Sequence, residues 1–295
     1  MSYKVGVVGS INVDMTLITD RIPHKGETLL GENVIYSAGG KGANQAVAAA
    51  RAGAKVTMFG CVGDDSNGEK MIDNLSSCGI ETAYVDKLDG ISTGLAVITV
   101  GEKDNTIIVI PGANSSVDCG YIDKISSELK KMDIVLIQQE IPETAVDYVV
   151  DFCHGHGIMT MLNPAPARDI REETVEKADY LTPNEHETKL IFPGEDLETL
   201  LRKYPEKLVV TLGSKGAVSC SKTGELIQVK AGKVDVCDTT GAGDTFNGIL
   251  AAMIAGNMPL EDAMLYANAG AGLSTEKMGA QGGMPSLEEI KARFM

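Results

Sequence analysis

From Ser116 onward the chain alternates segments of strand character with segments of helical character. Strands that are buried on both faces read as short apolar runs, and the run at 4–8 is of this kind. The alternation predicts an α/β fold: a mostly parallel central sheet with helices on both faces and ligand sites at the strand carboxyl ends. The expected strands are 4–8, 56–60, 134–138, 158–162, 207–212 and one ending at Thr182; the expected helices are 121–130, 144–154, 260–277, two ending at Ala52 and Cys78, and two beginning at Glu185 and Ser286.

Two pairs of strands without helices between them interrupt this order. The first pair is 15–19 with 28–36, and the second is a hairpin of 93–100 with 105–110 around the turn 101–104. Together they predict a small β-sheet lid, drawn from about 13–36 and 93–110, over the glycine-rich part of the chain. No linker and no internal repeat divides the sequence, so we expect residues 1–295 to form a single domain with this lid.

Several apolar side chains on the lid strands have no helix in the sequence to cover them. An exposed apolar sheet usually meets a partner surface, so we expect a homodimer through the lid sheet. The positions that carry this expectation are Met15, Leu17, Val97, Ile107 and Val109.

The formal net charge of −15 argues against nucleic acid and anionic membrane surfaces as partners. It also requires any anionic ligand to have a local, built-in positive site. No apolar run approaches membrane-spanning length, and the first four residues lead directly into a strand rather than a signal peptide. The six cysteines are scattered without a C-x-x-C pair, which indicates free thiols and a cytoplasmic location.

The ten residues 238–247, Asp-Thr-Thr-Gly-Ala-Gly-Asp-Thr-Phe-Asn, join a strand end at 233–238 to a helix that begins near Ala242. The Gly-Ala-Gly turn lets another molecule approach the backbone, and the first N–H groups of the helix have no partners of their own. Such a turn is an anion hole. Asp244 within it is either a general base for a hydroxyl that attacks a bound phosphoryl group, or a cap of its own helix.

A second glycine-rich stretch, 37–44, opens the helix that ends at Ala52. Its glycine spacing does not fit a Walker A motif, but Lys41 and Asn44 are placed to donate to ligand oxygens. Asn12 and Asp14 follow the first strand and suit a ligand rich in hydroxyls; the alternative is a turn held by its own side chains.

Taken together these stretches resemble the ribokinase (phosphofructokinase-B) family of sugar kinases. The resemblance runs from Gly9 to about Glu289. It is carried by Gly-Gly-Lys-Gly-Ala-Asn-Gln-Ala at 39–46, Thr-Pro-Asn-Glu at 182–185 and Asp-Thr-Thr-Gly-Ala-Gly-Asp-Thr-Phe at 238–246. Residues 9–14, 111–114 and 163–167 look most like the members that phosphorylate ribose.

The resemblance implies a role for each matching residue. Asp244 is the expected catalytic base, with the amides of Gly241, Ala242, Gly243 and Asp244 as the anion hole. The sugar-binding positions are Asn12, Asp14, Gly40, Lys41, Asn44 and Glu140. Asn184 and Glu187 organise magnesium and phosphate through water, and the remaining nucleotide positions are Thr211, Gly213, Ser214, Gly216 and Asn268. The shell of a potassium site is Asp238, Thr240, Ser274, Lys277, Gly279 and Gly283.

Two departures from the family pattern fall in the potassium shell: Lys277 stands where an arginine is frequent, and Gly282-Gly283 follow Gln281. The leading hypothesis is ATP-dependent phosphorylation of D-ribose to D-ribose 5-phosphate in the cytoplasm, with Mg²⁺ or another divalent cation and with K⁺. Two alternatives stay open. One is the same chemistry on another pentose, 2-deoxyribose or a nucleoside, and the other is a sugar-binding regulator without catalysis.

Overall fold

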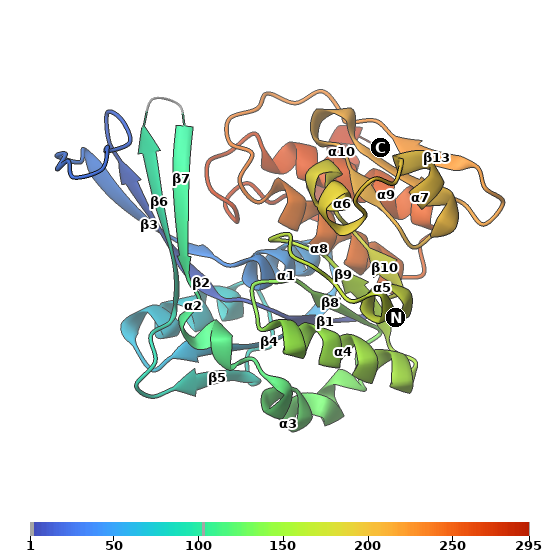
Figure 1. The fold of residues 1–295 in the computed structure, drawn as a ribbon, viewed down its shortest axis with the longest axis horizontal. Helices are drawn as coiled ribbons and strands as arrows, with labels where there is room; N and C mark the ends of the chain where they lie inside the picture. The colour runs from blue at the N-terminus through green and yellow to red at the C-terminus, as the bar shows by residue number, and fades with distance from the viewer. Residues whose placement is uncertain (1–2, 102–103, 295) are drawn as a thin grey trace.

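Six parallel strands form the central sheet of this computed structural model, which describes residues 3–101 and 104–294 (Figure 1). Every neighbouring pair in the sheet is parallel, as the alternation predicts. The strands in sheet order are β10 (Tyr180–Leu181), β9 (Met159–Leu162), β8 (Ile134–Ile137), β1 (Lys4–Val8), β4 (Lys55–Gly63) and β5 (Val85–Leu88).

Alternate residues of the central strands face two separate cores. In β1, Val5 and Val7 pack with one cluster of buried side chains, and Val8 packs with the other. Helices cover both faces, as expected (Figure 1). The first core contains side chains of α1 (Lys41–Arg51), α2 (Ser66–Ser77), α8 (Ala242–Ala255), α9 (Leu260–Ser274) and α10 (Leu287–Phe294); the second contains those of α3 (Cys119–Leu129), α4 (Glu143–His156), α5 (Glu172–Lys177) and α7 (Leu197–Lys203).

The predicted lid is a four-stranded sheet that projects from the main body (Figure 1). Its order is β3 (Asn33–Gly39), β2 (Asn12–Ile18), β6 (Gly94–Gly101) and β7 (Asp104–Ile110). The strand expected at 28–36 is displaced to β3, because the antiparallel register pairs Gly39 with Asn12 and so extends pairing to the end of the glycine-rich stretch. Residues 102 and 103 of the expected turn lie outside the described residues.

The chain after α6 (Glu185–Ile191) departs from simple alternation. The strand expected at 207–212 is the short β11 (Val210–Thr211), which pairs antiparallel with β12 (Ala217–Cys220), and β12 pairs with β13 (Leu226–Val229). The strand end expected at 233–238 does not form. Instead, the amides of Cys237 and Asp238 both donate to the carbonyl of Thr275.

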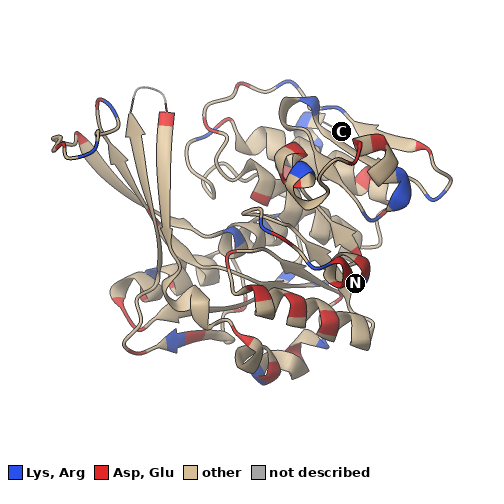
Figure 2. Ribbon diagram, in the orientation of Figure 1, with Lys and Arg blue, Asp and Glu red and all other residues tan. Residues whose placement is uncertain are grey.

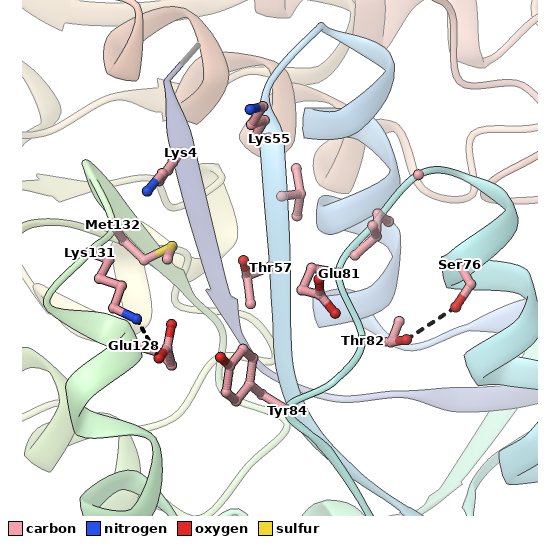
Figure 3. Close-up of a pocket in the computed structure, with 13 residues that line it drawn as sticks. Lys4, Lys55, Thr57, Ser76, Glu81, Thr82, Tyr84, Glu128, Lys131 and Met132 are labelled. Atoms are coloured by element: carbon pink, nitrogen blue, oxygen red, sulfur yellow. Dashed lines mark hydrogen bonds and ion pairs between the residues drawn. The ribbon is translucent and has the colours of Figure 1, made fainter.

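A polar hollow of about 630 Å³ opens at the amino ends of β1 and β4 (Figure 3). Lys4 and Lys55, which begin these strands, and Lys131 line it together with Glu81 and Glu128. This is the sheet edge opposite to the strand carboxyl ends, where the candidate residues lie. Within residues 3–101 and 104–294, no helix is long and apolar enough to cross a membrane.

Candidate active site

The turn that starts α8 has the geometry of an anion hole. Gly241 adopts φ 78°, and a Cβ there would lie 2.8 Å from Ala280, so glycine is required. Gly243 faces open space. Within the described chain the N–H groups of Gly241, Gly243 and Asp244 find no acceptor, whereas that of Ala242 donates to the carbonyl of Thr239 at 3.2 Å. Three of the four predicted amides are therefore free donors, at the positive end of the α8 dipole.

Asp244 directs its carboxylate away from its own helix. Gly241 is the N-cap of α8 and no side chain caps this end, so the capping alternative does not describe Asp244. Its Oδ2 accepts from Asn44 Nδ2 and its Oδ1 accepts from Gln45 Nε2, each at 3.0 Å. The side chain is only 8% exposed. A buried carboxylate held by two donors next to free amide groups has the arrangement that a general base requires.

The two signature stretches meet because α1 and α8 cross closely. A Cβ on Gly248 of α8 would lie 2.4 Å from the carbonyl oxygen of Gln45 and 2.6 Å from the Cβ of Ala48. The glycine thus lets the two helix backbones approach to contact distance. This crossing fixes how far Asn44 and Gln45 stand from Asp244.

Glu140 holds the start of α1. Its Oε2 accepts from the Ser10 hydroxyl at 2.6 Å and from the backbone N–H of Lys41 at 3.1 Å. Gly40 precedes the helix with φ 87°, and a Cβ there would lie 2.7 Å from the backbone nitrogen of Asn12. Sequence reasoning missed Ser10, whose hydroxyl also accepts from the N–H of Gly42.

Asn12 and Asp14 lie on β2, where this strand leaves the core for the lid. Asn12 is buried, and its Oδ1 accepts from Asn114 Nδ2 at 2.7 Å. The carboxylate of Asp14 lies against Gly39, where a Cβ would be 2.1 Å from Asp14 Oδ1. The alternative for this segment was a turn held by its own side chains. Instead, the segment is part of β2, and Asn12 bonds to the distant Asn114.

One lysine lies among four carboxylates. Burial lowers the pKa of Lys41, but the charges of Asp244, Glu140, Glu187 and Asp14 outweigh it and raise that pKa above its usual value. Burial, with repulsion from Glu140 and Asp244, raises the pKa of Asp14 to about 7. These mutual effects place the predicted sugar-binding and catalytic groups within one electrostatic cluster.

The nucleotide positions expected from the sequence gather at the neighbouring strand ends. Asn184 pairs with Thr211 in an isolated parallel bridge, and 213–216 follow directly. Asn184 and Glu187 form a capping box on α6, so their side chains also stabilise that helix. Asn268 donates to the carbonyl of Lys230, just after β13.

The expected potassium shell is only partly brought together. Asp238 accepts from Thr240 N, Thr240 Oγ1 and Gly279 N at 2.7 to 2.9 Å. Burial acts to raise the pKa of Asp238, but these hydrogen bonds outweigh it and hold that pKa below its usual value. Gly283 packs on the carbonyl of Ser274. Lys277 lies beside Glu289, in a hollow that Gly283 also lines, and hydrogen bonds from Ser286 together with the charge of Lys277 lower the pKa of Glu289.

Comparisons with known proteins point to one family. The model of the pfkB family of carbohydrate kinases matches residues 3–287. The ribokinase of Bacillus subtilis is 45% identical over 98% of both chains, and the deoxyribokinase of Salmonella typhi is 37% identical over 97% of both. The structure of Arabidopsis thaliana ribokinase complexed with ribose and ATP superposes with a TM-score of 0.92, at 29% identity over 100% of both chains. The chain thus belongs to the pfkB family of carbohydrate kinases.

Proposed function

We propose that this protein transfers the terminal phosphoryl group of ATP to the primary hydroxyl of D-ribose, giving D-ribose 5-phosphate. The observation that carries the proposal is the buried Asp244 carboxylate beside the free N–H groups of Gly243 and Asp244. The relatives named ribokinase support the sugar, and the neighbour with bound ribose and ATP supports both substrates.

In this proposal, residues of two elements, β2 and α1, hold the sugar through its hydroxyls. Asn12 and Asp14 on β2, with Lys41 and Asn44 on α1, offer donors and acceptors that a furanose or pyranose diol can satisfy. Glu140 contributes to sugar binding mainly by holding the start of α1, through its hydrogen bonds with Ser10 and the N–H of Lys41.

In the reaction, Asp244 takes the proton of the primary hydroxyl as that oxygen attacks the terminal phosphoryl group of ATP, and the bond from this group to the bridging oxygen breaks so that ADP leaves. The open amides of Gly243 and Asp244 stabilise the charge on the transferred group, and Gly241 gives the turn its shape. Lys41 remains protonated among its carboxylates and keeps a positive charge beside them. The predicted adenosine-side residues Thr211, Gly213, Ser214, Gly216 and Asn268 complete the nucleotide position.

We expect Mg²⁺ to bind together with the nucleotide phosphates and not to a set of several protein ligands. Within the described chain, no group of three or more His, Cys, Asp or Glu side chains is arranged to hold a metal. Burial raises the pKa of the Glu187 carboxyl, which faces the same cluster as Lys41 and Asp244. Glu187 and Asn184 would hold the ion through water, and the ion would neutralise phosphate charge.

A related substrate is the nearest alternative, because one relative is a deoxyribokinase. A coupled assay of ADP release across pentoses, 2-deoxyribose, hexoses and nucleosides ranks the substrates by kcat/KM. A sugar-binding regulator would release no ADP with any of them.

We further propose that residues 1–295 act as one unit with the lid, in the cytoplasm, as a homodimer. The free state of the described cysteines supports a reducing compartment. The lid strands β3 and β6 contain no charged residue, and β2 and β7 contain one each (Figure 2). Apolar side chains on β3 and β7 are exposed, including Ile108 at 66%.

Asp244→Asn should retain ribose and ATP binding but lower kcat by a factor on the order of 10² to 10⁴, since the amide cannot accept the proton. Steady-state kinetics with isothermal titration of both ligands measures this. Asp262→Asn, an exposed acid on α9, is the matched control. Turnover of Asp244→Asn near the wild-type rate would remove Asp244 from the mechanism.

The KM for ribose should rise as the pH falls below about 7, by up to about ten-fold per pH unit. Asp14 in the free protein gains a proton in this range, because its pKa is raised to about 7, and it then loses an acceptor for sugar hydroxyls. The measurement is KM for ribose between about pH 8.5 and about pH 6 at saturating MgATP. Asp14→Asn should have a higher KM that does not change with pH; an equal slope in both proteins contradicts the assignment.

Potassium should raise the rate several-fold over sodium. Asp238 is a partly buried acid that no lysine or arginine pairs with among the described residues, so a large cation would supply its counter-charge. The assay uses saturating ribose and MgATP in a tetramethylammonium buffer, with KCl or NaCl added at matched ionic strength. Asp238→Asn should abolish the difference. Identical wild-type rates in all three salts would eliminate the site.

Light scattering at micromolar concentration should give the mass of a dimer. Ile108→Glu should convert it to a monomer, because a charge at this exposed position of β7 would be desolvated at the interface. Leu190→Glu, an exposed leucine on α6, is the matched control and should stay dimeric. A monomeric mass for the unmodified protein refutes the lid interface.

A further inference from the structure

A chain of three side-chain amides ends on Asp244. Asn74 Nδ2 donates to Gln281 Oε1 at 2.8 Å, and Gln281 Nε2 donates to Asn44 Oδ1 at 2.9 Å. Asn44 Nδ2 then donates to Asp244 Oδ2 at 3.0 Å. The chain begins on α2, passes through the segment between α9 and α10, and reaches α8 through α1. We call it the amide relay.

Each link of the amide relay points in the same direction. A primary amide accepts through its oxygen and donates through its nitrogen, so a donor on the oxygen of Asn44 turns its NH₂ toward Asp244. If the Asn44 amide were flipped, two oxygens would face each other across the contact with the carboxylate. Gln281 is the only described residue whose side chain donates to Asn44 Oδ1. It therefore determines which end of Asn44 meets the base.

Gln45 gives Asp244 a comparable second contact from the other side. Gln138 Nε2 donates to Gln45 Oε1 at 2.7 Å, and Gln45 Nε2 donates to Asp244 Oδ1 at 3.0 Å. Gln45 and Gln138 are fully buried. Substitution there would disturb the packed crossing of α1 and α8 as well as the hydrogen bond. Gln281 and Asn74 are half-buried, so their substitution tests orientation with less loss of packing.

The segment that carries Gln281 also contacts the anion hole. Its Ala280 lies against Gly241, where a Cβ would approach to 2.8 Å, and its Gly279 N–H donates to Asp238 Oδ2. One segment thus supports the turn of free amides on one side and orients the partner of the base on the other.

We propose that Gln281 is a positioning residue for the transfer reaction: it orients Asn44 so that the Asn44 amide donates to Asp244 and holds its carboxylate toward the substrate hydroxyl. The inference rests on the proposed sugar kinase activity. It assigns a function to a residue outside the expected sugar, nucleotide and cation positions. Gln281 contacts no substrate in this assignment and acts through Asn44.

The test compares Gln281→Glu and Gln281→Leu with the wild-type protein. Gln281→Glu is nearly isosteric, but an ionised carboxylate cannot donate to Asn44 Oδ1 and favours the flipped amide. We expect kcat to fall about ten-fold or more in Gln281→Glu and less in Gln281→Leu, with KM for ATP within about two-fold of wild type. The acidic limb of the kcat–pH profile should move to higher pH, because a carboxylate that loses a donor is protonated more readily.

Asn74→Leu tests the first link at a distance from the base. It should shift kcat and the acidic limb in the same direction but by less, and it should add nothing to Gln281→Leu in the double variant. Asn67→Leu, on the same helix and with no side-chain hydrogen bond among the described residues, is the matched control. Thermal unfolding of each variant separates loss of stability from loss of orientation.

The outcomes separate the inference from the proposed function. If the wild-type protein releases no ADP with ribose, the proposed function fails. If it turns over and both Gln281 variants keep its kcat and pH profile, the amide relay is overturned alone. If Gln281→Glu does not fold, Gln281→Leu and Asn74→Leu decide by the same two measurements.

Discussion

The crossing of α1 and α8 is the contact on which the site depends. Both helices begin at glycine-rich turns, but within the described chain only α8 leaves N–H groups free at its start, because Glu140 and Ser10 accept from the first N–H groups of α1. Their close approach at Gly248 puts the amides of Asn44 and Gln45 within hydrogen-bonding distance of Asp244. The core beneath is built mainly from small and aliphatic side chains of α1, α8 and β1, which keeps this geometry rigid. Asp244 and its two amide donors are thereby carried by helices and not by flexible loops.

The charged side chains around this crossing are mostly acidic. Among the described residues, Lys41 is the lysine of the cluster formed with Asp14, Glu140, Glu187 and Asp244. Anionic nucleotide phosphates therefore need further positive groups beside Lys41, and the free backbone amides at the start of α8 can supply them in a chain of net charge −15. Burial, together with the same crowding of carboxylates, raises the pKa of Asp14. A neutral, hydroxyl-rich sugar suits this environment better than a charged one.

Much of this arrangement could be predicted from residue patterns. Apolar periodicity identified the parallel sheet, the start of α8 and the lid strands, and the family resemblance named Asp244 and its neighbours. Gln45 lay inside the first signature, but nothing in a linear sequence shows that its amide meets a carboxylate 199 positions away. The prediction of a strand end at 233–238 was wrong for a similar reason, because the distant carbonyl of Thr275 accepts from the N–H groups that a strand would need for pairing. Local sequence patterns predict local structure, whereas contacts between distant segments can be seen only in the three-dimensional structure.

The strand β2 belongs to two parts of the molecule at once. Its first residue, Asn12, is buried in the core, and its last, Ile18, lies in the projecting lid sheet. Asn12 and Asp14, two of the proposed sugar-binding residues, are therefore carried by a different element from α8, which carries Asp244. Such a division gives the scaffold evolvability: changes along one strand can retune substrate choice while the phosphoryl-transfer machinery stays intact.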